Sequence, residues 1–233
     1  MKLRQRTRRA GLIILVTAIV SFVLLAIYTN VPTNYTAQDE AVFEDTLHLK
    51  PLRHPQTFAQ EIEAIKFIQQ GTFFIVPKNT SKNDHTVREP AEFLGMREGI
   101  CYDRSRLTDK AIAYIGLPSR HVYLFFRKGE RGFFSSLFRL KNPSHAVTEV
   151  KTSEGWMLVD SASDWIALTR DGQVVNADDV LQRSKEFNVI PPYLVGPSWA
   201  IRGMYSRHGQ LYPPYIFFPD FNWPDFFSWL IFG

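Results

Sequence analysis

An uninterrupted apolar run stands near the N-terminus, at residues 11–28 (GLIILVTAIVSFVLLAIY), and carries no charge. Its length approaches the roughly 20 apolar residues that a helix needs to cross a bilayer, and no polar face interrupts it. The alternative is a cleaved signal peptide, whose apolar region runs about 7–15 residues and ends in a small-x-small site that residues 26–28 lack. The pattern therefore predicts a retained transmembrane anchor.

Helical spacing returns at residues 56–70, after a stretch with little periodicity. Residues 29–55 mix Thr, Asn, Pro and scattered charges, which is typical of a stalk or linker, and one short strand is expected at residues 41–49. Gly71 is expected to end the helix, and the apolar run 72–76 fits either a strand or a helix end. The apolar stripe of this helix consists of Phe58, Ile62, Ile65 and Ile68.

A second helix is predicted at residues 107–115, preceded by one or two helical turns at residues 89–96. Apolar positions recur there with the spacing of one buried helix face, and Gly116 followed by Pro118 prevents continuation. The apolar face consists of Leu107, Ala111, Ile112 and Ile115.

Strand patterns follow the second helix. Residues 119–126 (SRHVYLFF) are rich in β-forming side chains, and residues 127–142 read as a long basic hairpin loop. Residues 145–150 alternate as a strand does, residues 153–155 supply a turn, and residues 156–160 form the return strand. A helix followed by an antiparallel meander indicates an α+β fold.

The C-terminal part is less regular. Asn176 is a suitable N-cap for a helix at residues 177–187, after which Pro-Pro, Gly-Pro and aromatic residues dominate. Ten aromatic residues lie within residues 212–233, and the segment 226–232 is too short to span a bilayer. We interpret this tail as packed over the core of its own domain. The alternative is an interfacial segment in contact with the membrane, or a patch that docks a partner.

These patterns divide the chain into five parts: a basic N-terminus (1–10), the anchor (11–28), a linker (29–55), an α+β domain (56–189) and a Pro- and aromatic-rich extension (190–233).

The charge is distributed unevenly. Of the 27 Lys and Arg residues, five lie within the first ten positions, which leaves 22 basic against 23 acidic residues elsewhere. Basic residues before an apolar helix predict a cytoplasmic N-terminus and a single-pass protein of the inner or plasma membrane. The body would be extracytoplasmic, and periplasmic in a Gram-negative cell. A nucleic-acid partner is not expected, because the body carries no basic excess.

Cys101 is the only cysteine, which excludes an intrachain disulfide and a cysteine-based zinc cluster. It opens the stretch Gly99–Ser105 that leads into the second helix. A thiol on a first helical turn faces unpaired backbone N–H groups and the positive end of the helix dipole, and both favour the nucleophilic thiolate. A buried cysteine acting as a small hydrophobe is the alternative.

His145 and Asp160 complete a candidate catalytic set with Cys101. His145 begins one strand of the predicted hairpin and Asp160 ends the other, so the two should be neighbours. That arrangement suits a base and the carboxylate that orients it, with Cys101 as the nucleophile. Asp164 is the rival for the third role, and His121 is interpreted as structural. No metal or other cofactor is expected, because the remaining histidines lack metal-ligand spacing.

Four blocks of sequence together resemble the transglutaminase-like superfamily: Gly99–Ser105, Gly116–Arg120, His145–Ala146, and Gly155–Trp156 with Val159–Asp160. The resemblance covers roughly residues 58–165. It implies a papain-like fold whose nucleophile helix packs on an antiparallel sheet, with a Cys–His–Asp triad in this chain order. The family often has Trp two residues after the His, where this chain has Val147.

The expected function is that of a membrane-anchored, extracytoplasmic cysteine enzyme. Cys101 would take an acyl group from a peptide or protein amide as a thioester and pass it to water or to an amine, with hydrolysis favoured. The alternative is a catalytically inactive module of the same fold, serving as a membrane-tethered interaction or assembly partner. The oligomeric state is left open.

Overall fold

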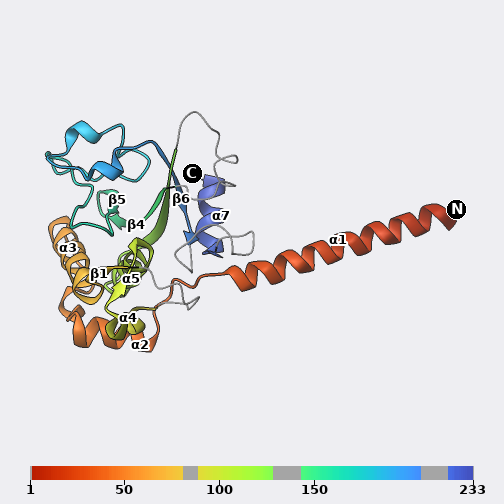
Figure 1. Ribbon diagram of the computed structural model, residues 1–233, viewed down its shortest axis with the longest axis horizontal. Coiled ribbons are helices and arrows are strands. Elements are labelled where there is room, and N and C mark those ends of the chain that lie inside the picture. The colour runs from red at the N-terminus through yellow and green to blue at the C-terminus, as the bar shows by residue number, and fades with distance from the viewer. Residues whose placement is uncertain (1, 81–88, 128–142, 206–219, 233) are drawn as a thin grey trace.

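A computed structural model describes residues 2–80, 89–127, 143–205 and 220–232. The first element, α1 (Lys2–Thr29), is one long helix that projects away from a compact body (Figure 1). Within it, Arg8–Thr29 is long and apolar enough to cross a membrane, with a mean hydropathy of 2.9 and no part of that window buried in the protein. The predicted apolar helix at residues 11–28 lies inside this span.

The body is built on a four-stranded antiparallel sheet. Its strands are β3 (Ser119–Phe126), β4 (Ser144–Thr152), β5 (Gly155–Val159) and β6 (Ser198–Arg202), in the order β5-β4-β3-β6. β4 and β5 form the predicted hairpin, with Thr152 paired to Gly155 next to the turn. The loop predicted at residues 127–142 lies outside the described residues from position 128 onward.

Helix α5 (Cys101–Tyr114) packs on one face of this sheet, and α3 (Phe58–Ile75) packs on α5. The alternating strand residues Val122 and Leu124 point into this core, which is closed by Leu107, Ile112, Ile65 and Ile68. A helix that begins at the only cysteine and packs on an antiparallel sheet confirms the predicted α+β class. Gly116 ends α5 with φ of +90°, as predicted.

Helix α3 is longer than predicted, because Gly71 does not end it. A Cβ atom at Gly71 would lie 2.7 Å from Leu47 Cδ2, so the glycine permits close packing on the preceding segment. The apolar run 72–76 therefore forms the last turn of the helix and not a strand.

The segment before α3 is helical and buried, and the strand expected at residues 41–49 is wrong. α2 (Ala37–Ala41) continues into a wider turn, η1 (Val42–Thr46), and a short 3-10 turn, η2 (Lys50–Leu52), follows. Thr36 starts α2 because its hydroxyl accepts from the Asp39 N–H while the Asp39 carboxylate accepts from the Thr36 N–H. Four side chains of this segment lie in the main core, so it packs as part of the body and not as a free stalk: Val42, Phe43, Leu47 and Leu49.

Three short elements precede α5. α4 (Pro90–Met96) confirms the helical turns predicted at residues 89–96. β1 (Lys78–Asn79) pairs in parallel with β2 (Glu98–Gly99), directly before Cys101. Residues 81–88, between β1 and α4, lie outside the described residues.

The helix predicted at residues 177–187 is not formed. The segment makes consecutive turns that finish in the short 3-10 turn η3 (Ser184–Glu186). Asn176 does act as a cap, since its Oδ1 accepts from the N–H groups of Asp178 and Asp179. However, the Ala177 N–H donates to Glu149, and Asp178 pairs with Arg202, so the sheet holds this segment in an irregular path.

The C-terminal extension covers the other face of the sheet. After η4 (Pro192–Leu194), the strands β7 (Met204–Tyr205) and β8 (Asp220–Phe221) pair, and α7 (Trp223–Phe232) follows. Trp223, Phe226 and Trp229 of α7 pack on a buried cluster that includes Tyr123 and Phe125 of β3. This packing agrees with the interpretation of the tail as a cover for its own domain, although residues 206–219 lie outside the described residues.

Candidate active site

Cys101 is the first residue of α5, at the start of the helix as predicted. The Ile100 N–H donates to the Asp103 carboxylate at 2.8 Å, and this cap fixes where the helix begins. The Cys101 side chain is half-buried. Its sulfur accepts hydrogen bonds from the N–H groups of Tyr102 and Ala146, so the helix start and strand β4 both contact the thiol.

His145 and Asp160 lie side by side next to this thiol. His145 is the second residue of β4, and Asp160 directly follows β5. The His145 Nε2 atom is 2.6 Å from Asp160 Oδ1, and both side chains are buried. His145 also hydrogen-bonds Cys101, and because Asp160 occupies Nε2, the ring nitrogen that remains for the thiol is Nδ1. The structure thus brings together the three residues that the sequence singled out.

The contacts within this trio shift the pKa of each member toward the charged form. Burial by itself would raise the pKa of the Cys101 thiol, but the hydrogen bond and charge of His145, with the Ala146 and Tyr102 N–H groups, lower it overall. Burial would lower the pKa of His145, yet Asp160 and Cys101 together raise it to about 9. Burial would raise the pKa of Asp160, but the hydrogen bond and the charge of His145 lower it overall. The arrangement favours a thiolate beside an imidazolium.

Asp160 is supported by residues that the sequence pattern did not indicate. Ser163 Oγ donates to Asp160 Oδ2 at 2.6 Å, and the Tyr193 hydroxyl donates to the same oxygen. The Tyr193 ring also meets the His145 ring edge-on at 5.3 Å. Gln69 of α3 donates to the Asp160 carbonyl at 2.8 Å. Ser163 lies only three residues after Asp160, so its hydrogen bond to that carboxylate could have been predicted from the spacing. Tyr193 lies 33 residues after Asp160 in an irregular Pro-rich segment, and no sequence pattern indicates its contact.

Asp164 and His121, the other Asp and His residues considered for the site, do not belong to the trio. Asp164 is exposed to solvent, whereas Asp160 is buried against His145. His121 is buried, its Nδ1 lies 2.9 Å from Ser105 Oγ, and its ring stacks on Tyr205 at 4.0 Å. Burial lowers the pKa of His121, so its ring is neutral, and its position within the core suits a structural role.

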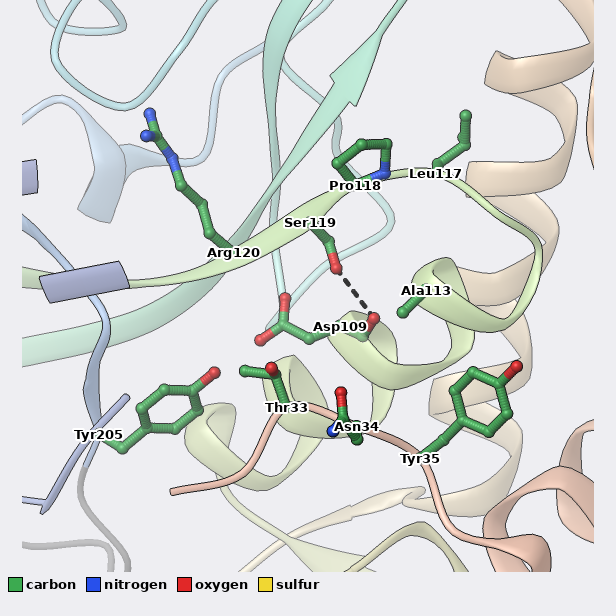
Figure 2. A pocket seen from close by; sticks show the side chains of 10 residues that line it. All are labelled: Thr33, Asn34, Tyr35, Asp109, Ala113, Leu117, Pro118, Ser119, Arg120 and Tyr205. Carbon is green, nitrogen blue, oxygen red and sulfur yellow. Dashed lines mark hydrogen bonds between the residues drawn. The ribbon is translucent and has the colours of Figure 1, made fainter. Parts of the chain in front are cut away.

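Among the cavities formed by the described residues, one is lined by residues that hold Asp160 in place. This cavity of about 650 Å³ is lined by Ser163 and Tyr193, which donate to Asp160, and by Trp165, Ile190 and Lys66 among others. A second cavity, of about 490 Å³, lies between the segment after α1 and the middle of α5 (Figure 2). Its wall includes Thr33, Asp109 and Arg120, and the trio does not contribute to it. Within the described ranges, no group of three or more His, Cys, Asp and Glu side chains converges as a metal site would require.

Comparison with known proteins agrees with this geometry. Residues 55–161 match the transglutaminase-like superfamily, and this range contains Cys101, His145 and Asp160. The match confirms the resemblance drawn from the four sequence blocks.

The crystal structure of a candidate cysteine protease from Cytophaga hutchinsonii is similar at 14% identity and a TM-score of 0.34. That similarity covers 64% of this chain and 44% of the other, which is too distant to carry a conclusion about this site. No curated protein matches the chain.

Proposed function

We propose that this protein is a membrane-anchored, extracytoplasmic cysteine enzyme of the transglutaminase-like type. It takes the acyl group of an amide or peptide onto Cys101 as a thioester and cleaves or transfers it. The observation that carries the proposal is the hydrogen-bonded chain from Cys101 through His145 to Asp160 at the start of α5. The anchoring part is supported by the apolar helix Arg8–Thr29, which has the length and composition of a membrane span.

Acylation begins with attack of the Cys101 thiolate on the carbonyl carbon of the substrate. A C–S bond forms, and the carbonyl oxygen becomes an oxyanion that the Cys101 N–H at the helix start can stabilise. The C–N bond then breaks, and the His145 imidazolium gives its proton to the departing amine. Asp160 holds the His145 ring in position throughout.

Deacylation repeats these roles with a second nucleophile. Neutral His145 takes a proton from water as the oxygen attacks the thioester, and the acid is released while Cys101 regains its negative charge. An amine in place of water would give a new amide. Hydrolysis is the reaction we favour, because the half-buried thiol leaves water free to reach the thioester.

An inactive interaction module would not need this arrangement. Burial of His145 and Asp160 costs free energy that a purely structural hairpin could avoid with apolar side chains. The retained charged pair, aligned on the only cysteine, therefore supports the enzyme over the module. The basic loop predicted at residues 127–142 would suit a module that binds a partner, and it lies outside the described residues from position 128 onward.

An activated ester tests the proposal without knowledge of the natural substrate. Purified full-length protein is mixed with p-nitrophenyl acetate, and the acetyl thioester at Cys101 is followed by mass spectrometry. We expect acetylation to be about 100-fold or more faster in the wild type than in His145→Ala, which is the contribution typical of general acid–base catalysis. Equal rates in both proteins, with both folded, would overturn the proposal. Loss of the acetyl group in water alone, compared with loss in the presence of glycinamide, then separates hydrolysis from transfer.

A further inference from the structure

Helix α7 is strongly apolar along most of its length. Its sequence, WPDFFSWLIF, contains one charged residue, Asp225. One side, with Trp223, Phe226 and Trp229, packs on the sheet. The last turn of α7 remains open, with exposed fractions of 61% for Leu230, 68% for Ile231 and 83% for Phe232. Exposed apolar side chains gathered in one place normally mark a contact with a partner or a membrane, so this open turn needs a cover.

The beginning of α7 is joined to the end of α1. The Trp223 indole N–H donates to the Ala26 carbonyl at 2.9 Å, and the Trp223 ring meets Phe22 edge-on at 6.1 Å. The Val31 N–H donates to the Phe221 carbonyl at 2.7 Å, directly before α7. α7 is therefore held at the body end of the helix that has the properties of a membrane span.

The direction of α7 suits a helix that lies along a membrane surface. Figure 1 shows α7 on the side of the sheet from which α1 projects, and shows it running across the direction of α1. If α1 crosses the bilayer, α7 lies at the level where α1 leaves it. Trp223 then stands at the headgroup level, where Trp side chains are enriched.

We propose that α7 is a second membrane contact, which lies in the headgroup region of the bilayer that α1 crosses. The inference rests on the membrane anchoring in the proposed function, and is independent of the catalytic chemistry. α7 has no basic residue, so its contact with lipid depends on burial of Leu230, Ile231 and Phe232 and not on attraction to anionic headgroups. Neutral lipid is therefore sufficient.

This two-point attachment places the candidate active site near the membrane surface. Val31 lies two residues beyond the end of α1, a distance of at most about 7 Å along the chain. Val31 belongs to the same buried cluster as Tyr102 and Ala146, and Cys101 packs against this cluster. The substrate of such a site would be an amide bond presented at the membrane surface.

Spin labels on single cysteines test the contact in the full-length chain. The background is Cys101→Ser, and the protein is reconstituted in phosphatidylcholine bilayers. Labels are placed at Ile231→Cys in α7, at Leu15→Cys in α1, and at Val189→Cys as a matched exposed control. Val189 is 75% exposed and lines a cavity with Lys66 of α3. Figure 1 shows α3 on the side of the body away from α1. Power saturation compares collisions with oxygen, which concentrates in lipid, and with a water-soluble nickel chelate.

We expect the labels at positions 231 and 15 to collide more with oxygen than with nickel, and the label at position 189 to show the reverse. If position 15 reports lipid while position 231 matches position 189, the inference about α7 is overturned and the anchor stands. A position 231 label shielded from both reagents would also overturn it, because protein would then cover α7. If position 15 itself reports water, the anchoring part of the proposed function fails.

Discussion

At the scale of single residues, the proposed chemistry depends on how Asp160 holds His145. Asp160 accepts hydrogen bonds from His145, Ser163 and Tyr193, so its carboxylate is fixed on both oxygens. Charge-assisted hydrogen bonds of this kind are about twice as strong as neutral ones. His145 and Asp160 could be predicted as neighbours from the sequence, because a hairpin brings the start of one strand to the end of the next, and Cys101 stood out as the only cysteine, at the start of a predicted helix. Tyr193 could not be predicted, because it reaches the site from an irregular segment far along the chain.

Asp160→Asn should leave the protein folded but slow acyl transfer by about 10- to 1000-fold. The loss is smaller than the roughly 10⁴-fold effect of the equivalent change in a serine triad, because the Cys–His pair is already charged before substrate binds. Steady-state hydrolysis of p-nitrophenyl acetate measures this. Asp164→Asn is the matched control and should leave the rate of hydrolysis nearly unchanged, since Asp164 is exposed. A larger loss from Asp164→Asn than from Asp160→Asn would assign the third role to Asp164.

Tyr193 makes two contacts with the trio that can be separated. Tyr193→Phe keeps the ring against His145 and removes one hydrogen bond from Asp160, so we expect less than about a 10-fold fall in the acetylation rate, in line with one lost hydrogen bond. Tyr193→Ala removes both contacts and should lower the acetylation rate further than Tyr193→Phe does. Comparison of acetylation rates across pH in the two variants checks the order, and an equal effect of both would show that the ring contact contributes nothing.

At the scale of elements, the sequence predicted the helices and strands that pack a single face on the core, because such packing leaves a periodic pattern of apolar residues. β3, β4, β5 and α5 match their predicted positions closely, because each shows one face to the main core. The failures have identifiable causes. Gly71 is a site of close packing and not a helix end, the capping box of Thr36 starts a helix where a strand was expected, and contacts with Glu149 hold residues after Asn176 in turns.

Gly116→Ala should destabilise the end of α5. Its φ of +90° is unfavourable for a residue with a side chain, and a Cβ atom would lie 2.6 Å from His54 Nδ1. We expect a loss of about 1–3 kcal/mol in the free energy of unfolding, measured with denaturant and tryptophan fluorescence in detergent. Gly95→Ala in α4 is the control: its Cβ meets nothing within 4 Å, so it should be neutral or stabilising by about 0.5–1 kcal/mol. Equal loss from both substitutions would contradict this account.

At the scale of the whole molecule, a basic N-terminus, an apolar helix and a neutral body follow one another along the chain. The sequence indicated this division from charge and hydropathy alone. It did not indicate that residues 36–52 belong to the body, because their burial depends on partners distant in sequence. Lys110 of α5 lies 3.1 Å from Asp39, and both side chains are buried. Such long-range pairs leave no periodic signal.

The orientation of the molecule can be tested in a bacterial host. Basic residues before α1 predict that the N-terminus stays in the cytoplasm and the body lies outside. Protease added to intact spheroplasts should therefore degrade the body, as detected with an antibody against it. A cytoplasmic marker protein is the control for leakage. Protection in intact spheroplasts, with degradation only after lysis, would refute the orientation.

The central claim is that His145 activates Cys101, and the pH dependence of alkylation measures this directly. Cys101 is the only cysteine, so the rate of iodoacetamide labelling of the full-length protein reports its thiolate fraction. Because the pKa of Cys101 is lowered and that of His145 is raised to about 9, the thiolate–imidazolium pair should persist from below the usual thiol pKa of about 8.5 up to about pH 9.

We therefore predict rapid labelling of the wild type on the acidic side of pH 8.5, with a change in rate near pH 9 as His145 loses its proton. In His145→Ala the acidic reactivity should disappear, and the midpoint should return to about 8.5 or higher, since burial then acts without the compensating charge. A wild-type midpoint at or above about 8.5, shared with a folded His145→Ala variant, would contradict the account.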